Sequence, residues 1–218
     1  MSDESLFREV DEEVRQEQFK KLWDRFGNYV IALMVAVVVV VAGIKGWQFW
    51  QVRQSEAAAD IYFAAAKAAG TGKAGEAVKQ FAAVDHAGFG QLARLREANG
   101  LASQGKTAAA VKLYDAIAAD AAADPTLRDL ARIRAGYVLA DTLKPDELLL
   151  RLGAFDNDAS PWRHAAREIF GIAAWRTADY TMAGRDMDAI MADPEAPASI
   201  RQRAQVMAQL LVPLLAKK

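Results

Sequence analysis

The chain has 218 residues, a formal net charge of −1 and no cysteine. A near-neutral balance gives no field that would favour a nucleic acid or another polyanion as the partner. The missing cysteines exclude disulfides, thiolate metal sites and cysteine catalysis. The length allows one or two ordinary domains with a sizeable core.

Residues 1–28 predict an amphipathic helix. Leu6, Val10 and Val14 recur four residues apart, and Leu22 and Phe26 continue the apolar face. Two roles fit this pattern. The helix either lies on anionic lipid headgroups or docks to a cytosolic or membrane partner.

Residues 29–50 predict a single transmembrane helix. Tyr29 to Ile44 reads YVIALMVAVVVVVAGI, and extension to Trp50 gives 22 positions interrupted only by Lys45 and Gln48. About 20 residues suffice to cross the hydrocarbon core of a bilayer. Aromatic residues flank both ends and Lys45 can reach the headgroups, so the expected membrane-interface residues are Trp23, Phe26, Tyr29, Lys45, Trp47, Phe49 and Trp50.

A cleaved signal peptide is the main alternative for this stretch, because Ala57, Ala58 and Ala59 resemble a cleavage site. A long, highly charged segment precedes the apolar run, and bulky Trp47, Phe49 and Trp50 separate the run from that site. Both features suit an anchor better. A buried core helix and a re-entrant hairpin fit the run less well, since it is apolar on every face and has no central breaker.

Basic residues near the membrane predict the orientation. Four lie within about 15 residues on the N-terminal side: Arg15, Lys20, Lys21 and Arg25. The other side offers Arg53, plus Lys45 inside the boundary. We therefore expect residues 1–28 in the cytoplasm and residues 51–218 in the periplasm, with the chain a single-pass protein of a bacterial inner membrane.

Residues 51–218 predict an all-α domain, because breakers recur at fairly even intervals and no strand-like alternation appears. The second helix of each predicted helix pair has a small or aliphatic packing residue, called its anchor, at a recurring position. These anchors are Ala77, Ala110, Leu148 and Ala183, with intervals of 33, 38 and 35 residues. These intervals resemble the period of about 34 residues of tetratricopeptide repeats. The expected fold is one transmembrane helix followed by a tetratricopeptide-like α-solenoid of about four helix pairs and a capping helix over Ser199–Leu215. A non-repeating helical bundle is the alternative.

The first helices of stacked pairs line a concave groove in such repeats. Counting along these helices places Asn99, Tyr137, Glu168 and Trp175 on that face. Aromatic groups with a polar neighbour suit the capture of a peptide or partner segment. Tyr137 and Trp175 are equally compatible with packing between repeats.

No chemical site is indicated by the sequence, so no catalytic residue, cofactor or metal is expected. His86 and His164 lie far apart and suit surface or satisfied core positions better than metal binding. Asp156, Asn157 and Asp158 suit a helix-breaking turn better than a calcium loop, because the EF-hand spacing and its closing Glu are missing.

The whole chain resembles the ancillary subunit family of the bacterial Sec translocon, in its alphaproteobacterial form. The resemblance rests on the architecture and on two segments, FREVDEEVRQEQFKKLWDRFGN and GWQFWQ. It implies a non-enzymatic role that links Sec translocon subunits to a periplasmic chaperone or prolyl isomerase during protein export. The alternatives are a periplasmic scaffold for cell-envelope assembly or division, and an enzyme with an unrecognised site.

Overall fold

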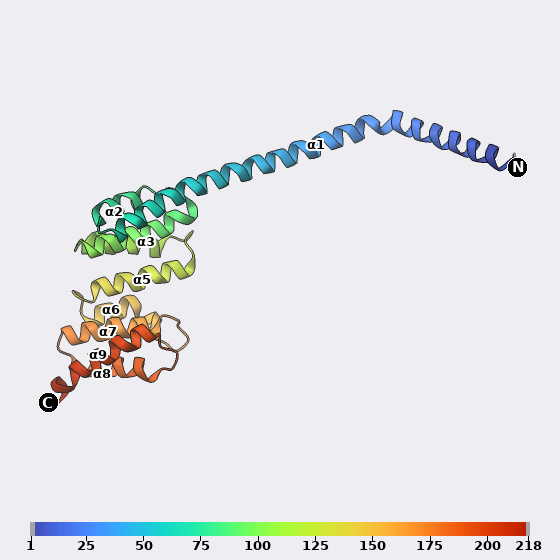
Figure 1. Ribbon diagram of the computed structural model, residues 1–218. Coiled ribbons are helices and arrows are strands. Elements are labelled where there is room, and N and C mark those ends of the chain that lie inside the picture. Colours follow the sequence, from blue (N-terminus) through green and yellow to red (C-terminus); the bar gives the residue numbers. More distant parts are fainter. Residues whose placement is uncertain (1–2, 217–218) are drawn as a thin grey trace. The chain divides into compact units, whose positions relative to one another are not determined.

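The computed structural model describes the backbone of residues 3–216 and the side chains of residues 20–216. Within this range every regular element is helical, as predicted, and Figure 1 shows their succession. The α-helices are α1 (Asp3–Gly70), α2 (Ala74–Ala82), α3 (Ala87–Ser103), α4 (Thr107–Ala119), α5 (Pro125–Leu139), α6 (Pro145–Leu152), α7 (Arg163–Arg176), α8 (Tyr180–Ala192) and α9 (Ala198–Leu215). A short 3₁₀ helix, Gly153–Phe155, follows α6.

The chain divides into two compact units between Glu56 and Ala57. In the first unit, α1 carries a stretch long and apolar enough to cross a membrane, and only 6% of its most apolar window is buried. The consecutive residues Val37, Val38, Val39 and Val40 are all more than half exposed, and they lie on different sides of the helix. An isolated helix that is apolar all round suits lipid rather than water. This stretch therefore has the length and composition of a membrane span or signal anchor.

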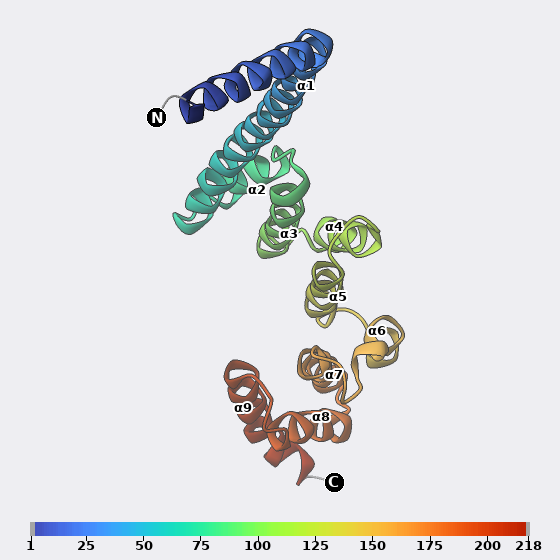
Figure 2. The same ribbon diagram turned by 90° about the vertical axis from the view of Figure 1, so that its right-hand side faces the viewer.

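The second unit consists of four helix pairs and a last single helix, which confirms the predicted repeat count. The end of α1 pairs with α2, and then α3 with α4, α5 with α6 and α7 with α8, with α9 covering α8 (Figure 2). Each core cluster contains residues of one pair together with the first helix of the next. The first helices α3, α5 and α7 are therefore each shared between two neighbouring cores, as in stacked repeats.

The turn inside three of the helix pairs contains one residue in the left-handed backbone conformation. Gly72, Gly105 and Ala178 have φ values of 81°, 74° and 62°, and each lies two residues before the second helix begins. Glycine adopts this left-handed conformation without steric cost, whereas alanine places its Cβ against the following carbonyl. The third pair is different, because Pro145 begins its second helix directly.

Replacing Ala178 with glycine should therefore raise the free energy of unfolding by about 1 kcal/mol. The gain comes from relief of the left-handed strain, reduced by the greater freedom of glycine in the unfolded chain. Urea unfolding of the full chain in detergent, followed by far-ultraviolet circular dichroism, measures the change. Loss of stability in the A178G variant would contradict the conformation described for this turn.

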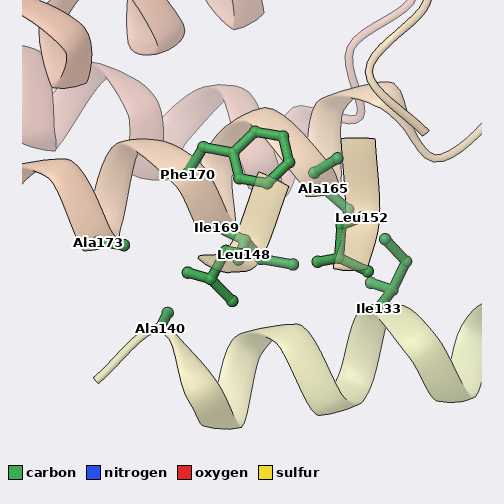
Figure 3. Packing of buried hydrophobic residues seen from close by; sticks show 9 residues of the cluster. Ile133, Ala140, Leu148, Leu152, Ala165, Ile169, Phe170 and Ala173 are labelled. Carbon is green, nitrogen blue, oxygen red and sulfur yellow. The ribbon is translucent and has the colours of Figure 1, made fainter. Parts of the chain in front are cut away.

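The four predicted anchors are all buried, with exposed fractions of 3% for Ala77 and 0% for Ala110, Leu148 and Ala183. The larger residues four positions later fill the space between pairs and are buried too: Phe81, Tyr114, Leu152 and Met187. Figure 3 shows this arrangement in the third pair, where Leu148 and Leu152 of α6 lie with Ile133 of α5 and Ile169 of α7. The periodicity of the sequence thus located the core correctly.

The last helix, α9, closes the final core with Ala204 and Leu211. It begins at Ala198, one residue before the predicted start, and Pro213 lies in its last turns without ending it. Its other side exposes Val206, Leu210 and Val212.

Candidate interaction surface

The first helices make one continuous layer. Close backbone contacts join α3 to α5, α5 to α7 and α7 to α9, whereas α2, α4, α6 and α8 make no such contacts with one another among the described residues. Helices on the inside of a curved stack lie closer together than those on the outside. Helices α3, α5, α7 and α9 therefore form the inner face of the stack, called the inner layer below. The sequence predicted a groove on this face.

The four predicted groove residues lie on these helices with different exposure. Asn99 of α3 is exposed, and Trp175 of α7 is 39% exposed. Tyr137 of α5 is half-buried, and Glu168 of α7 is only 3% exposed. The structure joins Tyr137 and Glu168 by a hydrogen bond, in which Asn99 and Trp175 take no part.

Glu168 is the centre of a hydrogen-bonded cluster that links α5, α7 and α9. The Tyr137 hydroxyl donates to Glu168 Oε2 at 2.5 Å. Arg203 of α9 donates from Nε to Glu168 Oε1 at 2.5 Å and from Nη2 to Oε2 at 2.7 Å. Both carboxylate oxygens are thus satisfied within the layer. Glu168 fixes the spacing of α5, α7 and α9 and offers little surface to a ligand.

Burial, and secondarily the neighbouring Glu168 carboxylate, raises the pKa of Tyr137 well above its usual range. Because the folded pKa lies above the unfolded one, the stability that this phenol contributes is present below pH 10 and is lost as the pH rises further.

Replacing Tyr137 with phenylalanine should lower the free energy of unfolding by about 1.5 kcal/mol near pH 7, since a hydrogen bond to a charged acceptor is lost. When the pH is raised from 7 to above 10, the free energy of unfolding should fall less in the Y137F variant than in the natural chain, because the variant has no phenol to ionise at this position. Urea unfolding across this pH range measures both effects. Equal alkaline losses in the two proteins would exclude Tyr137 as a contributor to the pH dependence.

The two histidines and the Asp-rich turn have structural partners. His86 caps α3, because its Nδ1 accepts from the backbone N–H groups of Gly88 and Phe89. His164 is buried and lies 2.8 Å from Asp193 Oδ2 through its Nε2 atom. Arg163 also donates to Asp193, and this bond holds the pKa of the Asp193 carboxyl well below its usual range.

Arg167 of α7 forms ion pairs with the acidic turn that precedes this helix. It donates to Asp156 Oδ1 at 2.8 Å and to Asp158 Oδ1 at 3.2 Å. Among residues 20–216, no group of three or more acidic or histidine side chains is arranged to hold a metal ion. The turn therefore acts as an ion-paired connection between α6 and α7.

Charge is unevenly distributed between the two layers. Helices α3, α5 and α7, together with α9, make up the inner layer and contain ten Arg, no Lys and three Asp or Glu, a net charge of +7 within the helices themselves. The second helices α2, α4, α6 and α8 contain four basic and six acidic residues, a net charge of −2. The balance of the whole chain hides this separation between the helices. Carboxylates of the connecting turns pair with Arg94, Arg163 and Arg167, so the basic excess of the inner layer lies on the arginines that have no such partner.

An apolar cavity of about 270 Å³ lies between α3 and the first turn of α5. Three leucines line it, Leu92, Leu127 and Leu130, together with Gly88, Gln91, Asp124 and Thr126. Leu92 is 43% exposed although it is large and apolar. A cavity of this kind suits one aliphatic side chain of a partner.

The expected membrane-interface residues lie in the first unit. Trp23, Phe26, Tyr29, Trp47, Phe49 and Trp50 are between 48% and 74% exposed, and Lys45 is exposed as well. Arg25 lies 5.6 Å from the centre of the Phe26 ring, and Arg53 lies 5.1 Å from that of Phe49. Amphipathic groups of this type occupy the headgroup region in membrane proteins, so their role at an interface stays a prediction.

Comparison with known families agrees with this geometry. The model of a family described as tetratricopeptide repeat-like domain matches residues 20–194, more than half of the chain. The chain belongs to this family. The matched range begins before the apolar stretch of α1 and ends just after α8, so the tetratricopeptide repeat-like match covers all four helix pairs. No curated protein and no solved structure matches the chain.

Tetratricopeptide repeat-like domains are typically non-enzymatic modules for protein–protein interaction. Three residues of the inner layer escaped the sequence prediction: Arg203, which holds Glu168, and the exposed Arg96 and Arg134. Arg203 gave no local signal, because its partner lies 35 positions earlier on another helix. Arg96 and Arg134 are 38 positions apart, the interval that also separates the anchors Ala110 and Leu148. A search for repeated charges at this interval would have found them.

Proposed function

We propose that the chain is a non-enzymatic interaction subunit of a bacterial inner membrane. Residues 29–50 anchor it, residues 1–28 lie in the cytoplasm and residues 51–218 present the repeat domain in the periplasm. The observation that carries the proposal is the combination of one exposed, membrane-length apolar segment with a tetratricopeptide repeat-like domain in a single chain. Lys20, Lys21 and Arg25 lie just before the apolar segment. Basic residues next to a membrane span favour the cytoplasmic side, which supports the proposed orientation.

Within this proposal, the partners are Sec translocon subunits and a periplasmic chaperone or prolyl isomerase. The resemblance of residues 7–28 and 46–51 to the translocon subunit family supports this assignment. Only residues 51–56 separate the proposed span from the second unit, so the repeat domain would stay within reach of a chain that emerges from the channel.

Site-specific crosslinking in living cells tests the proposal. A photoreactive residue replaces Trp175 or Asn99 of the inner layer in the full chain, and Lys79 or Lys112 of the second helices in matched controls. We expect the inner-layer positions to capture channel subunits, a periplasmic chaperone or a prolyl isomerase, and the controls to capture far less. Recovery of wall-synthesis or division proteins alone would overturn the translocon assignment. Equal capture from all four positions would overturn the groove as the site.

A further inference from the structure

Two equivalent arginines of the inner layer have no ion pair. Seven of its ten arginines donate hydrogen bonds or form ion pairs with Asp, Glu or backbone carbonyls, whereas Arg96, Arg128 and Arg134 have no such partner within residues 20–216. Arg128 is half-buried, but Arg96 and Arg134 are exposed. Exposed arginines without an ionic partner attract carboxylates from outside the domain.

Arg96 and Arg134 belong to a repeated three-step pattern. Leu92, Arg96 and Asn99 of α3 lie 38 positions before Leu130, Arg134 and Tyr137 of α5. Helices α3 and α5 are neighbouring first helices in contact. The residue pairs 38 positions apart therefore form the three steps of a ladder across the two helices: Leu92 with Leu130, Arg96 with Arg134, and Asn99 with Tyr137. In each helix the arginine follows its leucine by one turn, on the same face.

The first step of the ladder, Leu92 with Leu130, lines the apolar cavity between α3 and α5. Asp124 lies at the same end and accepts from the backbone N–H groups of Thr126 and Leu127. Hydrogen bonding from Thr126, through its side chain first and its backbone second, lowers the pKa of the Asp124 carboxyl. A partner carboxylate is repelled at that end and attracted one turn further along. The other acidic groups of these two helices lie beside arginines, with Asp129 paired to Arg132 and Glu97 next to Arg94.

We propose that this ladder binds an acidic, extended segment of a partner protein, with one aliphatic side chain in the cavity and carboxylates on Arg96 and Arg134. The proposal deepens the proposed function, on which it rests, by naming the chemistry of the partner. One helical turn rises about 5.4 Å, and two residues of an extended chain span about 6.6 Å. The acidic residues therefore lie about two positions from the aliphatic one in the bound segment.

Fluorescence anisotropy with the detergent-solubilised full chain tests this chemistry. The probe is a labelled peptide, Gly-Ser-Leu-Ser-Glu-Glu-Ser-Gly, and two comparison peptides carry Gln for both Glu or Ser for Leu. We expect each comparison peptide to bind at least tenfold more weakly, and the affinity of the probe to fall several-fold as the salt concentration rises to about 0.5 M.

Charge reversal locates the site. The R96E/R134E variant should bind the probe at least tenfold more weakly, whereas K79E/K112E, which reverses two exposed charges on second helices, should stay within twofold of the natural chain. Unchanged binding by R96E/R134E, or equal binding of the Gln peptide, would overturn the proposal. Displacement of the probe by short-chain phosphatidylglycerol would assign the ladder to anionic lipid and overturn it as well.

The same variant in the crosslinking experiment separates this inference from the proposed function. If the natural chain captures partners from position 175 and R96E/R134E loses them, both proposals stand. If R96E/R134E still captures the same partners, the acidic-segment proposal is wrong and the proposed function survives. If the natural chain captures no partner from the inner layer, the proposed function itself is wrong.

Discussion

Replacing Leu148 with alanine should lower the free energy of unfolding by about 3 kcal/mol. The expected loss runs against the sequence pattern, because the other three second helices carry alanine at the equivalent position. Leu148 is completely buried and packs with Ile133, Ile169 and Phe170, so its truncation leaves a cavity between α5 and α7. Urea unfolding of the full chain in detergent, followed by far-ultraviolet circular dichroism, measures the change.

Leu150 provides a control on the same helix. Its side chain is 90% exposed, so L150A should change the free energy of unfolding by less than about 0.5 kcal/mol. A stability of L148A equal to or above that of the natural chain would show that alanine suits this site as it does in the other pairs. The core described for the third pair would then be wrong.

Replacing Gly136 with valine should destabilise the domain by about 3 kcal/mol or more. A Cβ atom at this position overlaps Leu152 Cδ1 and lies 3.0 Å from Ile169 Cδ1, and valine adds two further methyl groups at the same crossing. Both neighbours are fully buried, so they have little room to move. Far-ultraviolet circular dichroism during thermal unfolding measures the loss as a lower Tm.

Gly75 of α2 is the matched control, since a Cβ added there meets nothing within 4 Å. The G75V variant should keep a Tm close to that of the natural chain, because valine is no worse than glycine in a helix. If G136V and G75V melt at the same temperature, the close crossing of α5 with α6 and α7 is not what limits the residue at position 136.

The sequence predicted the repeat domain well because its signals are local and periodic. The anchors Ala77, Ala110, Leu148 and Ala183 follow the helix pairs directly, and all four are buried as expected. Breakers in the sequence also marked the turns at Gly72, Gly105 and Ala178, although the left-handed conformation of Ala178 was not evident, because alanine rarely adopts it.

The interaction surface was predicted less completely because its partners lie on different helices. Tyr137 and Glu168 lie on α5 and α7, but their bond to each other and that of Glu168 to Arg203 join residues 31 and 35 positions apart. The charge separation between first and second helices was hidden by counting charges over the whole chain. It emerges only when each helix is assigned to its layer.

The orientation of the chain in the membrane decides which partners the inner layer can meet. The chain contains no cysteine, so single cysteines introduced at Ser5 and at the exposed Ser103 report their compartments without background. Intact bacterial cells that produce each full-length variant are treated with a thiol reagent that crosses the outer but not the inner membrane. We expect labelling of S103C in intact cells and of S5C only after lysis. Labelling of S5C in intact cells, with S103C protected until lysis, would contradict the proposed orientation.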